Sequence, residues 1–122
     1  MKILIADDSR VMRQIVTRTL RQAGFDGHDL VEAQDGKQAF DLVQSEKPDL
    51  VISDWNMPEM TGVECLRQLR ANGNDVKFGF VTSECTPEMM QQAEAAGALF
   101  FIIKPFTAER FDEVFSPIFG MI

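Results

Sequence analysis

The sequence has few basic residues and no long hydrophobic run, and each deficit excludes a class of function. Lys and Arg number 12 against 19 Asp and Glu, which gives a net charge of −7. Because proteins that bind nucleic acid neutralise its phosphates with basic side chains, this balance predicts no nucleic-acid partner. No apolar stretch is long enough to cross a bilayer, and the N-terminus enters an apolar run too early for a signal peptide. We therefore expect a cytoplasmic protein with no membrane partner.

Cysteine is scarce as well. The two cysteines, Cys65 and Cys85, have no metal-ligand spacing, and a reducing cytoplasm opposes a structural disulfide, so we expect two free thiols. Internal repeats, low-complexity tracts and linkers are also missing. A chain of 122 residues is long enough for one hydrophobic core and too short for two. We expect residues 1–122 to form one domain, with no output domain attached.

Short apolar runs alternate five times with amphipathic stretches along the chain. The expected strands are residues 3–6, 28–33, 50–53, 78–81 and 99–103. Each precedes a stretch with helical spacing of apolar residues, and these stretches open with the capping residues Ser9, Asp35, Thr61, Thr86 and Thr107. Apolar strands that are each followed by a helix indicate a parallel sheet covered on both faces. The predicted fold is therefore α/β, with a single doubly wound (βα)5 sheet of five strands.

Two of the expected helices carry apolar stripes that should face the sheet. In the first helix the stripe consists of Val11, Met12, Ile15, Val16, Leu20 and Ala23. In the last helix it consists of Phe111, Phe115, Ile118 and Phe119. Pro117 lies within the last helix and lacks the N–H that a helix interior uses, so it disfavours continuation of that helix.

Polar side chains directly follow four of the expected strands. Asp7 and Asp8 follow the first strand, Asp54 the third, Thr82 the fourth and Lys104 the fifth. The carboxyl ends of parallel strands share one edge of the sheet, and ligands of open α/β sheets bind at that edge. We therefore expect these five residues to form one charged site.

The three acids at this edge predict a metal site. Neighbouring carboxylates repel one another and favour their protonated forms unless a cation is present. Oxygen ligands in this number, with positions left for water or a phosphoryl oxygen, suit Mg²⁺. The alternative is that Asp7 and Asp8 only cap the first helix. For this pair together with Asp54, the metal site is the better interpretation.

Lys104 and Thr82 also have ordinary alternatives. Lys104 could be a solvated lysine in the turn at Pro105, and Thr82 could be a β-branched strand residue with no further role. An ammonium group beside carboxylates would instead pair with Asp54 and later with a phosphoryl oxygen. The hydroxyl of Thr82 would offer that oxygen a second donor.

These residues stand in a pattern that resembles the receiver domains of bacterial two-component response regulators. The pattern consists of Asp7–Asp8, Asp54 followed by Met57–Pro58 and Gly62, Thr82–Ser83, and Lys104–Pro105–Phe106. The likeness covers essentially the whole chain and is greatest to the stand-alone chemotaxis regulators of this family. It implies a flavodoxin-like fold with strand order 2-1-3-4-5.

The resemblance implies the chemistry of the acids. Asp54 would accept a phosphoryl group from a histidine kinase and form an acyl phosphate. Asp8, Asp54 and the backbone carbonyl of Asn56 would ligate Mg²⁺, and Asp7 would assist through water. Phosphorylation and dephosphorylation would be catalysed by the chain itself, so we do not expect an enzyme with external substrates.

The resemblance also implies how the phosphoryl group is held and sensed. Lys104 and Thr82 would bind two of its oxygens, and Thr82 would move toward it. Phe101 would turn inward as the switch aromatic, a position where the chemotaxis regulators typically have tyrosine; its alternative role is as a core residue. Asn56 and Glu84 would tune the lifetime of the phosphoryl state, which we expect to last seconds to minutes.

The partners implied are a histidine kinase of the chemotaxis type, a phosphatase, and the flagellar motor switch protein or another protein target, with the chain acting as a monomer. Val114 and Pro117 occupy positions where chemotaxis regulators present lysines to the motor. The face formed by the helix after Thr86, the strand before Lys104 and the last helix is therefore more apolar than in those regulators, which weakens the case for a motor partner.

Two alternatives to a chemotaxis switch remain. The first is a phosphorelay carrier or a phosphate sink for a kinase. The second is a Mg²⁺-dependent phosphatase that forms an aspartyl phosphate, but such enzymes space nucleophile and acid two residues apart after the first strand. Here the first-strand acids are adjacent and Asn56 stands two residues after Asp54, which disfavours an enzyme. Nucleotide binding is disfavoured because no strand is followed by a glycine-rich phosphate loop.

Overall fold

Five parallel strands form the central sheet of the computed structural model, which describes residues 1–121. The strands are β1 (Lys2–Ala6), β2 (Asp29–Ala33), β3 (Leu50–Ser53), β4 (Lys77–Thr82) and β5 (Phe101–Ile103). Their order across the sheet is β2-β1-β3-β4-β5, and each neighbouring pair is parallel. This order confirms the fold class and the topology predicted above.

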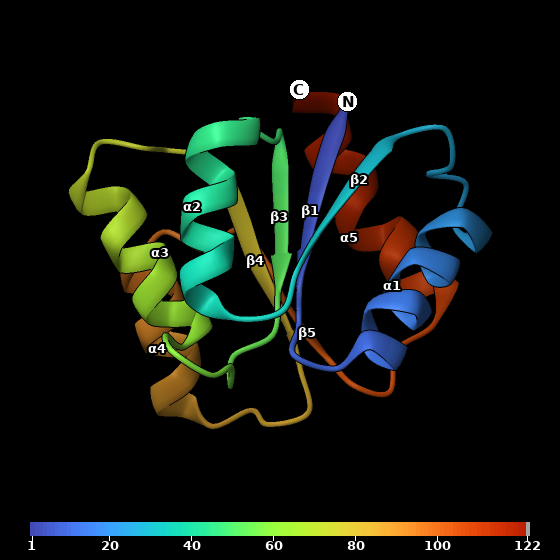
Figure 1. The fold of residues 1–122 in the computed structure, drawn as a ribbon. Coiled ribbons are helices and arrows are strands. Elements are labelled where there is room, and N and C mark those ends of the chain that lie inside the picture. The colour runs from blue at the N-terminus through green and yellow to red at the C-terminus, as the bar shows by residue number, and fades with distance from the viewer. Residues whose placement is uncertain (122) are drawn as a thin grey trace.

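Five helices cover the two faces of the sheet. They are α1 (Arg10–Gln22), α2 (Gly36–Glu46), α3 (Gly62–Ala71), α4 (Pro87–Ala95) and α5 (Ala108–Met121). In Figure 1, α1 and α5 lie on one face of the sheet, and α2, α3 and α4 lie on the other. None of the helices in the described part of the chain is long and apolar enough to cross a membrane.

Each face of the sheet has its own hydrophobic core. Alternate residues of a strand point to opposite faces, so Ile3 and Ile5 of β1 pack in one core while Leu4 packs in the other. The core under α1 and α5 includes Leu20 and Phe115. Because both faces are buried, the strands are fixed and their carboxyl ends form a stable edge.

Side-chain caps begin the helices where the sequence predicts them. The Ser9 hydroxyl accepts a hydrogen bond from the N–H of Met12 at 3.2 Å, so α1 starts immediately after the Asp7–Asp8 pair. The same three-residue bond is made by Asp35, Thr61, Thr86 and Thr107. Each cap satisfies an N–H group at the start of its helix that has no partner within the helix.

The apolar stripe predicted for α1 is wrong at two positions. Val11 is 65% exposed and Ile15 is 36% exposed. The buried face of α1 is instead formed by Val16, Thr19 and Leu20. With about 100° of rotation per residue, Val11 falls far from that face, and Thr19 takes an inward position because its hydroxyl donates to the carbonyl of Ile15 at 2.8 Å.

Strand β5 is shorter than predicted. It contains residues 101–103 only, and the expected strand residues Leu99 and Ile103 are 46% and 48% exposed. β5 pairs with β4 alone at one end of the sheet. An edge strand is covered less completely than a central one. The strand predicted from the apolar composition of residues 99–103 was therefore longer and more buried than β5 is.

Helix α5 does not end at Pro117, although proline disfavours continuation of a helix. Helix α5 runs through Pro117 to Met121, and Pro117 is exposed. The carbonyl of Glu113, four residues earlier, loses a helical partner, but Glu113 is itself exposed and water can replace that bond. The stripe on the other side of α5 is as predicted at Phe111, Phe115 and Ile118.

Candidate functional site

Asp7 follows β1, and both its backbone and its carboxylate are held in place. Its N–H donates to the carbonyl of Ala33 in β2 at 3.0 Å. Its Oδ1 accepts from the backbone N–H of Ser9 at 2.9 Å. The side chain is only 5% exposed. A nearly buried carboxylate is therefore fixed in one orientation at the end of the strand.

Asp54 follows β3 and is held in a similar way. Its N–H donates to the carbonyl of Ala6 at 2.8 Å, and its Oδ1 accepts from the N–H of Trp55 at 2.7 Å. The side chain is 14% exposed, and Oδ2 lies on the side of Lys104. The carboxylate is thus accessible from the edge of the sheet but does not project freely into solvent.

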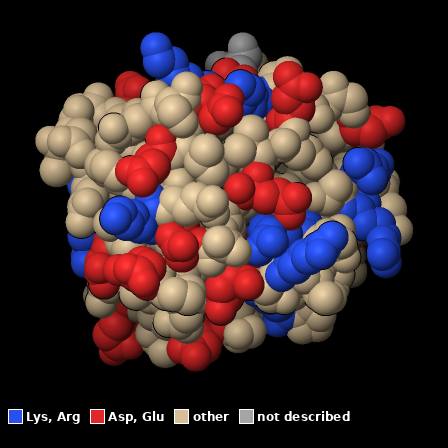
Figure 2. Space-filling model, in the orientation of Figure 1, with Lys and Arg blue, Asp and Glu red and all other residues tan. Residues whose placement is uncertain are grey.

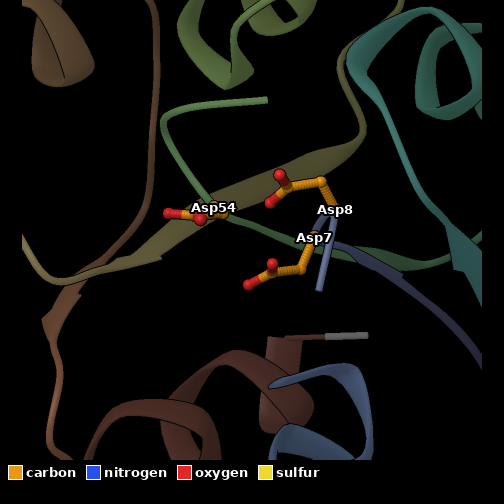
Figure 3. A group of neighbouring side chains, drawn as sticks. All are labelled: Asp7, Asp8 and Asp54. Carbon is orange, nitrogen blue, oxygen red and sulfur yellow. The ribbon is translucent and has the colours of Figure 1, made fainter. Parts of the chain in front are cut away.

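The carboxylates of Asp7, Asp8 and Asp54 come together, as the sequence predicts. β1 and β3 are neighbours in register, with Ala6 opposite Ser53, so the acids that follow the two strands lie side by side. One oxygen of each lies within 4.8 Å of the others, and Figure 3 shows the three side chains beside one another at the strand ends. Asp7 is buried and Asp8 is exposed. Such a group of oxygens, open on one side, suits a hard divalent cation such as Mg²⁺.

Lys104 joins this group from the end of β5. Its Nζ lies 3.2 Å from Oδ2 of Asp7 and 3.6 Å from Oδ2 of Asp54. The side chain is 15% exposed, and the peptide bond to Pro105 is cis. Pairing with Asp54 was expected, but the closer partner is Asp7. The lysine therefore lies between two carboxylates and is not a solvated residue of the turn.

Burial raises the pKa of the Asp7 carboxyl above its ordinary value, because desolvation disfavours the charged form. The N–H of Ser9 and the ammonium of Lys104 act in the opposite direction, while the charge of Asp54 adds to the rise. Burial is thus the main influence on the protonation of Asp7, and the neighbouring charges modify it in both directions.

Thr82 ends β4, the strand beside β3, and is 1% exposed. Its Oγ1 is 3.5 Å from the N–H of Glu84, a long hydrogen bond. Its carbonyl accepts from the N–H of Lys104 at 2.9 Å. The hydroxyl is therefore weakly engaged, at the same edge as the acids and the lysine. Glu84 is exposed beyond it.

Asn56 lies on the other side of the acids and is exposed. With Asp8, Met57, Pro58 and Thr61 it lines an open hollow of about 290 Å³. Asn56, whose backbone carbonyl is predicted to be a metal ligand, therefore borders the same space as Asp8, the exposed acid predicted to be another ligand. A small charged molecule can enter the site from this hollow.

Phe101 is half-buried in β5. Its ring centroid lies 6.1 Å from that of Trp55 and 6.1 Å from that of Phe80. It also lines a groove of about 240 Å³ together with Met90 and Leu99. Phe101 is therefore part of the aromatic packing behind Asp54 and at the same time reaches the surface between α4 and β5.

One residue beside the acids was not identified from the sequence. Arg13 donates from Nη1 to the backbone carbonyl of Asp7 at 2.6 Å and from Nε to Oε1 of Glu32 at 2.8 Å. These partners are brought together because β2 lies beside β1. An arginine on an amphipathic helix carries no sequence signal of such a contact, since most are solvated.

The sequence matches a known family over most of its length. The pattern of the response regulator receiver domain covers residues 3–116. The chemotaxis protein CheY of Pseudomonas aeruginosa is 39% identical over 124 residues, which span 100% of this chain and 98% of that protein. A chemotaxis protein CheY homolog of Campylobacter jejuni is 38% identical over 123 residues, spanning 98% of this chain and 93% of that protein.

Solved structures give the same likeness in three dimensions. The chemotaxis protein CheY4 of Vibrio cholerae superposes with a TM-score of 0.83 at 34% sequence identity. The superposition covers 96% of this chain and 97% of that one. Sequence and fold therefore agree along the same length of chain.

Proposed function

This chain belongs to the response regulator receiver domain family, and on that basis we propose that residues 1–122 form one receiver domain that acts as a phosphorylation-activated signalling switch. The phosphoryl acceptor is Asp54. The observation that carries the proposal is the meeting of Asp54 with Asp7, Asp8 and Lys104 at one edge of the sheet. Three acids and a lysine there provide a nucleophile, a cation site and a phosphoryl-binding ammonium.

The proposed reaction is transfer from a phosphohistidine of a kinase. An oxygen of the Asp54 carboxylate attacks phosphorus, the bond from phosphorus to the histidine nitrogen breaks, and an acyl phosphate forms. Lys104, freed from its carboxylate contacts, binds one phosphoryl oxygen, and the Thr82 hydroxyl binds another. The chain contributes mainly position and charge neutralisation, which dominate catalysis of phosphoryl transfer.

Mg²⁺ is the proposed cofactor, since the converging carboxylates fit a hard cation. Asp8, Asp54 and the backbone carbonyl of Asn56 would hold it, and Asp7 would assist through water. When bound, Mg²⁺ would neutralise charge on the carboxylates and on the incoming phosphoryl oxygens. Ser9 and Lys104 hold the Asp7 carboxylate in one orientation, which supports this indirect role.

Thr82 and Phe101 are proposed to relay the phosphorylated state to the surface. Thr82 has only a long hydrogen bond to lose when its hydroxyl turns toward the phosphoryl group. Phe101 borders both the packing around Trp55 and the groove beside α4. With no tyrosine in the chain, the contact that Phe101 offers a target is apolar. Reversing a 1:99 population in this way requires about 5.5 kcal/mol of differential binding.

Asn56 and Glu84 are proposed to set how long the acyl phosphate lasts. Both are exposed and lie just beyond the acceptor and the Thr82 hydroxyl. From these positions their side chains can orient or exclude the attacking water. The expected lifetime is seconds to minutes, and a half-life of many hours at room temperature would contradict it.

The proposed pathway is chemotaxis, in the cytoplasm, with the chain as a monomer. The support is the likeness to chemotaxis proteins over nearly the full length. A histidine kinase of the chemotaxis type would supply the phosphoryl group, a phosphatase would help to remove it, and the flagellar motor switch protein would be the target. Binding of a motor switch peptide only in the presence of beryllofluoride, an acyl-phosphate mimic, would support this pathway.

A phosphorelay carrier or phosphate sink is the second candidate. The observation that favours it is the apolar character of Val114 and the exposed Pro117 on α5, where the motor regulators present lysines. In that case the motor peptide would not bind with or without beryllofluoride. The phosphoryl group would instead pass back to a histidine protein. A Mg²⁺-dependent phosphatase is disfavoured, and only turnover of a generic phosphate ester would revive it.

The acceptor role is tested by phosphorylation with a radiolabelled histidine kinase of the chemotaxis type. Asp54→Asn should abolish incorporation of ³²P, because an amide cannot form the acyl phosphate. Asp41→Asn, which changes an exposed acid of α2, should label like the wild type. Robust labelling of Asp54→Asn would refute the assignment.

A further inference from the structure

Arg13 connects the metal-binding loop to the edge of the sheet. It lies at the end of the first turn of the arginine-rich helix α1, over which Figure 2 shows basic side chains gathered. Its side chain is 13% exposed, whereas its partner Glu32 on β2 is 54% exposed. The guanidinium donates to Glu32 and to the carbonyl of Asp7, so it is held in place and is not a freely solvated surface charge.

With the bond from Arg13, each backbone and side-chain polar group of Asp7 has a hydrogen-bond partner. The N–H of Asp7 is bound by Ala33, and its two carboxylate oxygens by Ser9 and Lys104. Its carbonyl is bound by Arg13 at 2.6 Å. That carbonyl belongs to the peptide plane shared with Asp8, because a peptide group is planar. Whatever fixes the carbonyl of Asp7 also fixes the direction in which the chain leaves toward Asp8.

We infer that Arg13 is a positioning residue for the metal site: with Glu32 it orients the Asp7–Asp8 peptide so that the exposed Asp8 carboxylate points toward Asp54. This inference rests on the proposed function, since it concerns the same Mg²⁺ site. Unlike the acids, Arg13 would not be a ligand itself, because its donors are directed to Glu32 and to the carbonyl of Asp7. It acts as outer partners of metal ligands do, by holding a ligand in its binding geometry.

Electrostatics alone predicts the opposite effect, which makes the inference testable. Arg13 carries a positive charge next to the site, and a positive charge disfavours binding of a cation. If Arg13 acted only through its charge, Arg13→Ala would strengthen Mg²⁺ binding. If it positions Asp8, the same substitution weakens binding even though a repulsive charge has been removed. The direction of the change separates the two roles.

The experiment is a titration of the unphosphorylated chain with Mg²⁺, followed by calorimetry and by the fluorescence of Trp55, which adjoins Asp54 and is the single tryptophan. Arg13→Ala should raise the dissociation constant about tenfold, the lower end of losses for outer partners of ligands. Arg13→Lys keeps the charge but not the forked donors, and should give a smaller loss.

The matched control is Arg18→Ala, which removes an exposed arginine of the same helix and should tighten Mg²⁺ binding slightly or leave it unchanged. Circular dichroism checks that every variant is folded, and Arg13→Met, which keeps the aliphatic stem without the charge, serves if Arg13→Ala is not. Unchanged or tighter binding in the folded Arg13→Ala or Arg13→Met variant would overturn the inference while leaving the proposed function intact. Failure of the wild-type chain to bind Mg²⁺ would overturn both.

Discussion

The negative charge of Asp7 belongs to the site, but its burial lowers the stability of the fold. Its pKa is raised chiefly by burial. The folded chain therefore keeps the proton of Asp7 to a higher pH than the unfolded chain does. Where the folded state binds more protons, the free energy of unfolding falls as the pH rises. The stability that Asp7 contributes is complete below its unfolded pKa and is lost as the pH rises through the folded one.

This sign can be measured with Asp7→Asn in buffer that contains a chelator. Between about pH 4, the ordinary value for Asp, and neutral pH, the wild type should lose more unfolding free energy than the variant. The measurement is urea unfolding at a series of pH values. Asp41→Asn, which removes an exposed acid, should follow the wild type. Parallel curves for the wild type and Asp7→Asn would contradict the direction of the pKa shift.

The two cysteines should differ sharply in reactivity. Burial raises the pKa of the Cys65 thiol to about 12, whereas Cys85 is exposed. Because the thiolate is the reactive form, Ellman's reagent near pH 8 should titrate one thiol in the native chain and two in guanidinium. Cys85→Ser should remove the fast reaction. Two fast thiols in the native wild type would contradict the burial of Cys65.

At the scale of elements, the sequence predicted the existence and order of strands and helices better than their faces and ends. The apolar runs and caps located all five strand–helix pairs. Val11 and Leu99 were misjudged because an apolar residue is not excluded from the surface; only packing decides which apolar residues are covered. The shortness of β5 follows from its place at the sheet edge, a property of the whole topology.

In the site, too, the positions of residues along the chain were predictable, whereas their side-chain contacts were not. Asp54, Asp8 and Lys104 could be placed together from sequence because parallel strands bring their carboxyl ends to one edge. The contact of Lys104 with Asp7 at 3.2 Å, closer than with Asp54, could not. Nor could the bonds of Arg13, whose partner Glu32 comes from a strand that is adjacent only in space. Both depend on side-chain geometry for which the sequence has no periodic signal.

Helix α5 contains a proline that should weaken it. Pro117 is exposed within the helix and deprives the carbonyl of Glu113 of a helical partner. Pro117→Ala should raise the free energy of unfolding by about 1–3 kcal/mol, because proline in a helix interior costs up to about 3 kcal/mol relative to alanine. Urea denaturation measures the gain.

Pro87→Ala is the control for this change. Pro87 occupies the first turn of α4, where proline is tolerated because the N–H has no helical partner. Its replacement should change stability little or lower it slightly. Equal effects of the two substitutions would mean that Pro117 does not strain α5.

At the scale of the whole molecule, charge is unevenly distributed. The net charge is −7, while α1 carries basic side chains and no acid. The acids of the site add local repulsion to this overall excess. A cation bound among them relieves repulsion only in the folded state, because the carboxylates converge only there. Binding of Mg²⁺ should therefore be coupled to the stability of the entire fold.

Mg²⁺ should raise the melting temperature of the wild type in the unphosphorylated state. A ligand present at 100 times its dissociation constant stabilises the state it binds by about 2.7 kcal/mol. NaCl at matched ionic strength controls for general screening of the net charge, and should give a smaller rise. Asp8→Asn removes an exposed carboxylate that is proposed to be a ligand, at little structural cost, so it should keep the response to NaCl and lose the extra response to Mg²⁺. Equal melting shifts with the two salts in the wild type would show that the acids do not form a specific cation site.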